Sequence, residues 1–380
     1  MTATNGTAAP WRIYLYGAGS IAWRHGVASQ SLGSDAELYA ADPSEASREA
    51  LKAKCPNVTL FEDGDSMLAS SEGQARDIVV IACPPFLHHS ATIAAFKSKR
   101  NVLCEKPLAR TQTELDEMLA AGDAAGRHFS ECSYRYLGNG ALTQARKIID
   151  NGGIGPVYHA SFINRQPRSR PGIEYQPASK WFLNKEKSGG GTIFDWGVYD
   201  LTMFFDVLRP TSVTINHAWT ATPSTSIDPP EHPITVETHA GASMTLTLAN
   251  GTTIPFYWER ASGFHGEPRS SINVDGASGG LSWEWVPTFD YKEEVDPLEQ
   301  GFKLTQYADV KGEVDTKEQK FEAFGWENAN LRPLLAFVDL IEGRESVALS
   351  RNRLEFNFST VLAMYKCAAE KRPITVDLKQ

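Results

Sequence analysis

The stretch RIYLYGAGSIA, residues 12–22, decides the fold of the first part of the chain. Its apolar beginning is typical of a buried strand, and the glycines that follow end the strand just before a helical stretch. Gly17, Gly19 and Ala22 fit the pattern G-x-G-x-x-G/A, in which the glycines permit a tight turn and a close pyrophosphate, and a small third residue lets the helix pack on the strand. We therefore expect a dinucleotide whose phosphates lie at a helix N-terminus on residues 17–22, which include Ser20 and Ile21.

Strand and helix patterns alternate after this turn. The segments ELYAADP (37–43) and ARDIVVIACPP (75–85) are typical of strands, and SEASREALKAKC (44–55) and SATIAAFKSK (90–99) are typical of helices. This alternation predicts a parallel sheet with crossover helices.

Beyond about residue 150 the pattern changes to strands joined by glycine turns, in residues 156–165, 211–219, 235–260 and 270–285. Polar and apolar residues alternate there, which predicts an antiparallel sheet with two unlike faces. Helical periodicity returns in residues 331–343 and 353–371. The sequence thus predicts an α/β protein with a disordered tail at 1–10, a Rossmann dinucleotide-binding domain at 11–135, and a second domain for substrate binding and oligomerisation at 136–380.

Composition limits the partners and the compartment. The chain has 380 residues and a net charge of -9, which argues against nucleic acid or an anionic membrane as a partner. We see neither an apolar run of membrane-spanning length nor a secretion signal. The five cysteines are scattered and never spaced as C-x-x-C, so we expect no disulfide framework, no metal site and a cytoplasmic location.

Asp42 ends the second predicted strand, near the position where an acid takes the ribose hydroxyls of NAD. An acid there also repels a 2′-phosphate, so we expect NAD rather than NADP. Two other readings stay open: Asp42-Pro43-Ser44 is also a good helix-capping sequence, and Arg48 is placed to meet a phosphate.

Two further motifs each allow both a structural and a functional interpretation. In LCEKPLART (103–111) a lysine lies between glutamate and proline at a strand end, where a solvated lysine is common. In SGGGTIFDWGVYDLTMFFDVL (188–208) the apolar residues have helical spacing, and Asp195 and Tyr199 lie one turn apart on another face. Asp195 at the helix dipole and a half-buried Tyr199 would explain that pair, but three glycines before a helix indicate that the backbone passes close to something large.

Taken together and in this order, GAGSIA, CPPFLHHSATIAAFKSKRNVLCEKPLA and GGGTIFDWGVYDL resemble the glucose-fructose oxidoreductase, inositol dehydrogenase and rhizopine-catabolism (Gfo/Idh/MocA) family. The resemblance runs over most of the chain, including the closing RPITVDL. It implies a Rossmann domain followed by an α/β domain with a large, mostly antiparallel sheet. It also implies oxidation or reduction of a sugar or cyclitol hydroxyl with NAD(H) or NADP(H).

The resemblance assigns the catalytic residues. Lys106 would reach the reacting hydroxyl, aimed by a cis bond to Pro107, and Asp195 matches the family's helix carboxylate. Tyr199 stands where many members carry histidine, as in the sugar oxidoreductase and dihydrodiol dehydrogenase branches, where tyrosine is the acid/base. Because free tyrosine has a pKa near 10, this role needs help, which a cationic Lys106 would provide.

The resemblance also assigns cofactor and substrate residues. It places Pro84 and His88, which follow the third strand, and Glu105 and Lys106, which follow the next one, at the cofactor, with Cys83 replacing a threonine. The segment CSYRYLGN departs from the family's N-x-R-[FY]-x-P, so Arg135 and Tyr136 are either pocket residues or ordinary core residues. Substrate contacts are expected from Arg135, Asn164, Arg165, Trp181, Asp195 and Tyr199. Arg168 and Arg170 are either clamps for an anionic sugar or simply solvated.

Three functions stay open: an oxidoreductase for a sugar, glycoside or cyclitol; an NAD-dependent glycosidase that oxidises the ring transiently; and a non-catalytic sugar-sensing regulator. Intact Lys106, Asp195 and Tyr199 argue against the third. We also expect a homodimer or homotetramer, because strands such as ASMTLTL and TIPFYWE carry apolar and aromatic residues on both faces of the second sheet.

Overall fold

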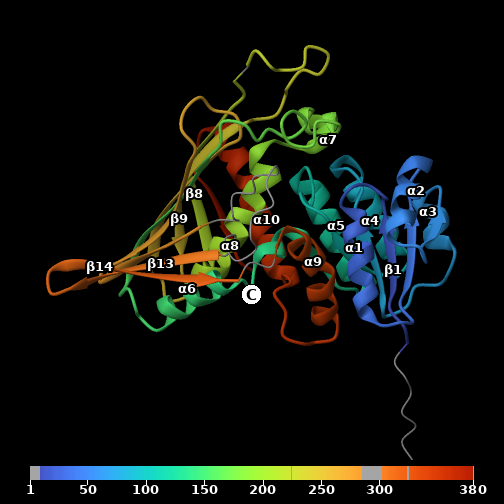
Figure 1. Cartoon of the computed structure of the whole chain (residues 1–380), viewed down its shortest axis with the longest axis horizontal. Helices are drawn as coiled ribbons and strands as arrows, with labels where there is room; N and C mark the ends of the chain where they lie inside the picture. The colour runs from blue at the N-terminus through green and yellow to red at the C-terminus, as the bar shows by residue number, and fades with distance from the viewer. Residues whose placement is uncertain (1–8, 224, 285–301, 323–324, 380) are drawn as a thin grey trace, which may run out of the picture. The chain divides into compact units, whose positions relative to one another are not determined.

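The computed structural model describes residues 9–223, 225–284, 302–322 and 325–379 (Figure 1). The chain divides into two units, each described by itself below. The first contains residues up to Ala109, Thr113–Cys132 and Glu327–Arg351, and the second contains Arg110–Gln112, Ser133–Trp326 and the residues from Asn352 onward. Most of the expected disordered tail, residues 1–8, lies outside the described residues.

A six-stranded parallel sheet forms the first unit, in the order β3-β2-β1-β4-β5-β6. This is the strand order of dinucleotide-binding Rossmann domains. The strands are β1 (Arg12–Tyr16), β2 (Glu37–Ala41), β3 (Thr59–Phe61), β4 (Asp77–Ile81), β5 (Asn101–Cys104) and β6 (Phe129–Glu131). All five residues of β4 are buried, as its apolar sequence predicts for a strand covered on both faces.

Helices connect these strands. They are α1 (Ala22–Ser29), α2 (Glu45–Lys54), α3 (Gly64–Ala69), α4 (His88–Lys97) and α5 (Gln112–Ala125). Side chains stabilise two of the helix starts: Ser44 caps α2 by accepting a bond from the Ser47 N–H, and Asp63 caps α3 by accepting one from the Ser66 N–H.

The first unit also includes a late segment, Glu327–Arg351, which contains most of α9 (Gly325–Ile341). This differs from the expected division into 11–135 and 136–380. Side-chain contacts explain the difference: Arg76 pairs with Glu342 at 2.6 Å, Arg351 donates to Asp123 at 2.8 Å, and Ser130 donates to the Leu349 carbonyl at 3.0 Å. Contacts of this kind join segments far apart in the sequence, so periodicity does not reveal them.

A nine-stranded sheet forms the second unit, in the order β14-β13-β12-β11-β7-β10-β9-β8-β15. Its strand pairs are antiparallel except β7 and β10, which run parallel. The strands are β7 (Val157–Arg165), β8 (Ser212–Ala221), β9 (His239–Thr247), β10 (Thr253–Ala261), β11 (Arg269–Gly276), β12 (Gly279–Trp283), β13 (Phe302–Val310), β14 (Glu313–Phe321) and β15 (Ile374–Asp377).

Helices of the second unit cover one face of this sheet (Figure 1). They include α6 (Gly140–Asp150), α8 (Val198–Leu208) and α10 (Arg351–Glu370), and the short α7 (Lys185–Ser188) precedes α8. Phe162 of β7 contacts Phe204 of α8 edge to face, with ring centroids 6.3 Å apart. Because side chains alternate along a strand, residues of β7 with even numbers face these helices and those with odd numbers face away.

None of the described helices has the length and apolar character needed to cross a membrane.

Candidate active site and cofactor-binding site

The glycine turn after β1 has the geometry that its sequence predicts. Gly17 has φ +111°, and a Cβ there would lie 2.8 Å from the carbonyl carbon of Ala82, so only glycine fits. A Cβ on Gly19 would meet nothing within 4 Å. The turn therefore has open space beside Gly19 at the start of α1, where backbone N–H groups favour an anion, and these residues fit a dinucleotide phosphate.

Asp42 lies at the end of β2 next to this turn. Its carboxylate accepts bonds from the Ala18 N–H and the Ser44 N–H, both at 2.9 Å. Arg48 donates to the Asp42 carbonyl oxygen at 2.6 Å, so a cation and an anion both lie at this corner. Asp42 therefore tethers the glycine turn to the second strand and also closes the short turn before α2, whose cap is Ser44.

The Glu105-Lys106-Pro107 segment follows β5, and its Lys106–Pro107 bond is cis, as the resemblance implies. The Glu105 carboxylate is buried, accepts a bond from the Lys106 N–H at 3.2 Å, and lies 2.9 Å from His25 Nε2 on α1. His25 is fully buried and lies 80 positions from Glu105. The sequence analysis did not single it out, because nothing local connects the two residues.

His88 is buried and joins two backbone segments of the first unit. Its ring nitrogens lie 2.9 Å from the Cys83 carbonyl oxygen and 2.8 Å from the Pro107 carbonyl oxygen. Burial lowers the pKa of His88, although both carbonyl contacts oppose this shift. His88 thus links the end of β4, where Pro84 lies, to the cis proline beside Lys106.

In the second unit, Asp195 and Tyr199 occupy the start of the helix that the sequence predicts, and both are buried. Residues Ile193–Gly197 form a π-helical turn before α8, so Asp195 lies in a turn wider than the α-helical spacing assumed. Arg135 donates from Nη1 to the Tyr199 hydroxyl at 3.0 Å, and the Tyr136 ring packs edge to face on Tyr199. The structure therefore brings Arg135, Tyr136 and Tyr199 together in the core of one unit.

The glycine triplet before this helix passes close to Tyr365 and to the backbone of Glu237. A Cβ on Gly190 would lie 2.0 Å from the Tyr365 hydroxyl, and one on Gly191 would lie 1.8 Å from the Glu237 carbonyl oxygen. This confirms the predicted close approach and identifies its cause.

Glu237 caps the start of this helix from its side chain. Its carboxylate accepts bonds from the Gly191 N–H and the Ile193 N–H, both at 3.0 Å, and from the Tyr365 hydroxyl at 2.6 Å. Burial raises the pKa of Glu237, and burial together with this carboxylate raises the pKa of Tyr365 well above its usual value. The sequence analysis missed both residues, because neither belongs to a motif.

Asn164 and Arg165 lie on opposite faces of the sheet. Asn164 is on the helix-covered face, where it accepts a bond from Arg260, which forms a buried ion pair with Asp200 of α8 at 2.7 Å. Arg165 is on the other face, 3.5 Å from Glu259. Of these two expected substrate residues, only Asn164 shares a face with Tyr199.

Trp181 lies in the short helical turn Lys180–Leu183 and stacks on Phe182 with ring centroids 3.9 Å apart. Both side chains are half-buried.

The parallel sheet, its glycine turn and its acid at the end of β2 define a dinucleotide-binding protein. Residues 11–131 match the sequence model of the "Oxidoreductase family, NAD-binding Rossmann fold", and residues 142–282 match the "GFO/IDH/MocA C-terminal domain". The chain belongs to the Gfo/Idh/MocA oxidoreductase family.

Characterised relatives match over part of their length. D-glucoside 3-dehydrogenase of Escherichia coli K12 is 30% identical over 205 residues, which cover 53% of this chain and 55% of that protein. 1,5-anhydro-D-fructose reductase of Ensifer adhaerens is 32% identical over 151 residues, which cover 37% of this chain and 41% of that protein. The chain thus spans about half the length of the relatives it matches, or less.

Solved structures match over nearly the whole chain. Levoglucosan dehydrogenase in complex with NADH and L-sorbose has a TM-score of 0.73 at 18% identity, covering 97% of this chain and 99% of that one. The aldose-aldose oxidoreductase of Caulobacter crescentus has a TM-score of 0.69 at 20% identity, covering 97% and 100%. At these identities the likeness shows the fold.

Proposed function

We propose that this protein is an NAD-dependent oxidoreductase that acts on a ring hydroxyl of a sugar, glycoside or cyclitol. The observation that carries the proposal is the hydrogen bond from the Arg135 guanidinium to the buried Tyr199 phenol. Tyr199 lies in the first turn of α8, directly after the π-helical turn that contains Asp195. A phenol held in this way can act as an acid/base group, because a cation lies at its oxygen. The family to which the chain belongs is one of oxidoreductases.

Each residue has a defined part in this proposal. Tyr199 takes the proton of the substrate hydroxyl during oxidation, and Arg135 stabilises the phenolate that results. Asp195 and Lys106, assigned by the family resemblance, orient and hydrogen-bond the same hydroxyl. Bound NAD supplies the hydride acceptor.

The names of the relatives support a carbohydrate substrate. They include a glucoside dehydrogenase and an anhydrofructose reductase, and the levoglucosan dehydrogenase structure holds NADH and a sugar. The test is a panel of sugars, cyclitols and aryl glycosides with NAD, followed by both NADH absorbance and released aglycone. NADH without aglycone is the expected result. Aglycone without net NADH would instead establish a redox-assisted glycosidase, and NAD binding with neither product would indicate a regulator.

We propose NAD rather than NADP because the Asp42 carboxylate lies beside the glycine turn, where it would repel a 2′-phosphate. Titration of the two nucleotides should give a dissociation constant at least tenfold lower for NAD. Asp42→Ser should bring the two values together, whereas Asp35→Ser, an exposed acid on the same unit, should leave their ratio unchanged. Equal affinities in the wild type would remove Asp42 from this role and favour Arg48 as a phosphate ligand.

A further inference from the structure

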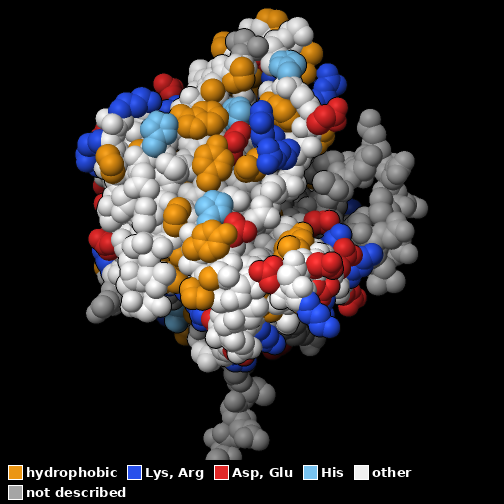
Figure 2. Space-filling view, turned by 90° about the vertical axis from the view of Figure 1, so that its left-hand side faces the viewer, with side chains coloured by type: hydrophobic (Ala, Val, Ile, Leu, Met, Phe, Trp, Pro, Cys, Tyr) orange, Lys and Arg blue, Asp and Glu red, His pale blue; other side chains and the backbone are white. Residues whose placement is uncertain are grey.

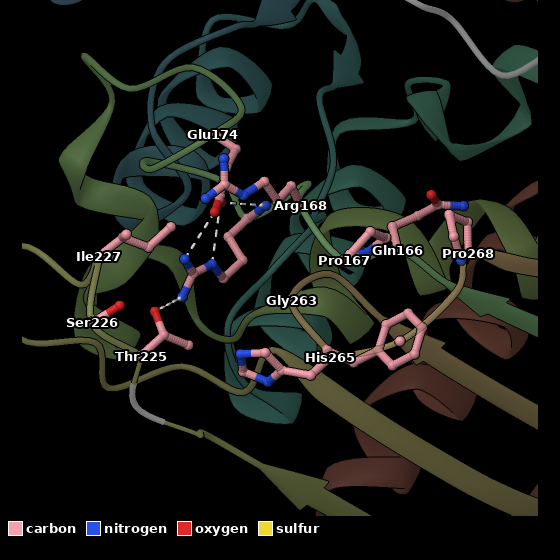
Figure 3. Close-up of a pocket in the computed structure, with 13 residues that line it drawn as sticks. Gln166, Pro167, Arg168, Glu174, Thr225, Ser226, Ile227, Gly263, His265 and Pro268 are labelled. Atoms are coloured by element: carbon pink, nitrogen blue, oxygen red, sulfur yellow. Dashed lines mark hydrogen bonds and ion pairs between the residues drawn. The ribbon is translucent and has the colours of Figure 1, made fainter.

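A pocket of about 460 Å³ opens in the second unit among three loops. The loops follow β7, β8 and β10, and they contribute Gln166 to Glu174, Thr225 to Ile227, and Gly263 to Pro268. Figure 3 shows Arg168 and Glu174 on one side of it, Thr225 and Ile227 on a second, and His265 on a third. Its volume is that of a small-molecule site.

A buried arginine holds the walls of this pocket in place. The Arg170 side chain is 3% exposed and donates to both oxygens of Glu174, at 3.1 and 2.8 Å. Its Nη1 also donates to Thr225 Oγ1 at 3.0 Å and to Asp228 at 2.7 Å. These bonds tie the loop after β7 to the loop after β8. Arg170 is therefore a structural clasp and not the anion clamp that the sequence left open.

Gly263 makes room for the clasp. A Cβ at this position would lie 2.6 Å from Arg170 Cδ. Arg170 is held against it because all three nitrogens of its guanidinium donate hydrogen bonds. The pocket is thus preformed, which lowers the conformational cost of filling it.

The charges of the pocket nearly cancel. Arg170 with Glu174 and Asp228 sums to one negative charge, and Arg168, which pairs with no acid in the part of the chain that the structure describes, offsets it. Polar groups of Gln166, Ser226 and His265 line the pocket together with apolar Phe264 and Ile227. This lining suits a neutral ring with many hydroxyl groups, because an anion would find no excess positive charge and an apolar ligand would desolvate charged groups.

The loop that carries the clasp also leads to the proposed acid/base. Tyr175 follows Glu174 directly, and its ring lies 6.4 Å from the Trp196 ring, which lies 5.8 Å from the Tyr199 ring. Ring contacts thus connect the residue after Glu174 to Tyr199 within the second unit.

The geometry points to this pocket as a subsite for the non-reacting sugar of a neutral glycoside, with the reacting ring at Tyr199. This inference rests on the proposed function and adds its substrate class: a neutral disaccharide or larger glycoside in preference to a free monosaccharide.

The experiment compares maltose, cellobiose, lactose and sucrose with glucose, galactose and fructose, all with NAD. At least one disaccharide should have a kcat/KM about tenfold above that of its component sugars. Ile227→Trp, which fills the pocket from an exposed position, and Arg168→Ala should each lower that ratio about tenfold. Lys317→Ala, an exposed cation on β14, is the matched control.

Binding of the preferred disaccharide, measured by calorimetry, separates the two proposals. Disaccharide binding that Ile227→Trp weakens tenfold, with no turnover of any sugar, would support the subsite and overturn the proposed function. Turnover with no disaccharide preference and no change in Ile227→Trp would overturn the subsite and leave the function intact. Preference for glucuronides or sugar phosphates over neutral glycosides would overturn the assignment of a neutral ligand.

Discussion

At the scale of the residue, the Arg135–Tyr199 contact is the feature that most directly suits proton transfer by a phenol. A guanidinium that donates to a phenol oxygen stabilises the phenolate, and both side chains are buried, so water screens the interaction little. The sequence analysis assigned this help to Lys106 alone. In the structure the Arg135 guanidinium donates to the tyrosine hydroxyl, and both residues belong to the second unit.

We expect Tyr199→Phe to lower kcat about a hundredfold to ten-thousandfold while NAD affinity stays near that of the wild type, because the change removes only an acid/base group.

Arg135→Met should shift the rise of kcat/KM to higher pH, and Arg135→Lys should shift it less, since the charge is kept. Steady-state kinetics across pH and NAD titration measure these effects. Arg146→Met, a half-exposed arginine on α6, is the control. Near-normal turnover of Tyr199→Phe on the true substrate would assign the proton transfer to Lys106 or His265 instead.

At the scale of the element, α8 owes its position to a cap supplied from two other elements. Glu237, just before β9, accepts bonds from the backbone N–H groups of Gly191 and Ile193, and Tyr365 of α10 donates to the same carboxylate. The π-helical turn with Asp195 follows at once, so this cap sets where the carboxylate and Tyr199 lie.

Gly191→Ala should cost about 3 kcal/mol of unfolding free energy, because its Cβ would overlap the Glu237 carbonyl, a backbone atom that cannot turn aside. Gly152→Ala is the matched control: its φ is +70° and its Cβ would meet nothing within 4 Å, so only the backbone penalty of about 1 kcal/mol applies. Urea unfolding of the two variants gives the comparison. Equal losses would show that α8 adjusts to the extra methyl group.

Glu237 predicts a pH effect on stability. Burial raises the pKa of this carboxyl above its ordinary value of 4.5, so the folded chain binds the proton more tightly than the unfolded chain does. Its stabilising contribution is therefore complete below about pH 4.5 and is lost as the pH rises through the raised pKa. Glu237→Gln does not titrate, so the unfolding free energy of the wild type minus that of the variant should fall as the pH rises.

Urea unfolding between about pH 4.5 and pH 8 measures this difference. Glu313→Gln, an exposed acid on β14, should show no such trend. A difference that grows with pH would mean that the three hydrogen bonds to the carboxylate outweigh its burial.

At the scale of the whole molecule, the nine-stranded sheet has a face that none of the described helices of its unit covers. On it Glu259 accepts bonds from His239 and Tyr257, both at 2.8 Å, and Trp219 packs on His239 with ring centroids 4.8 Å apart. Figure 2 shows hydrophobic side chains and histidines gathered on one face of the molecule. Half-buried aromatic side chains on such a sheet face are typical of a surface that another protein covers.

We therefore predict that the protein self-associates through this face as a dimer or tetramer. Trp219→Arg should raise the dissociation constant at least tenfold, because it places a charge among aromatic side chains. Val314→Arg, which changes a residue 67% exposed on β14, should have little effect. Light scattering that finds only the 41.8 kDa monomer for the wild type at micromolar concentration would contradict the prediction.

The sequence by itself determined the parallel sheet, the glycine turn, the strands of the second unit and the family. These features depend on local patterns: the period of apolar residues, a glycine at a positive φ, and a proline after lysine. Asp195 and Tyr199 were singled out through the family resemblance, since their spacing alone also fits an ordinary helix start, and their catalytic roles stay a prediction.

Only the tertiary structure decided what those residues contact. Arg135 meets Tyr199 across 64 positions, Glu237 meets Tyr365 across 128, and Arg170 is a clasp because Glu174 and Asp228 reach it from two loops. It also decided that Asn164 and Arg165, adjacent in the sequence, face opposite ways, and that Glu327–Arg351 joins the first unit. The physical reason is that a buried charge takes whichever partner the packing of distant segments brings within hydrogen-bond reach, and no local period of the sequence records that choice.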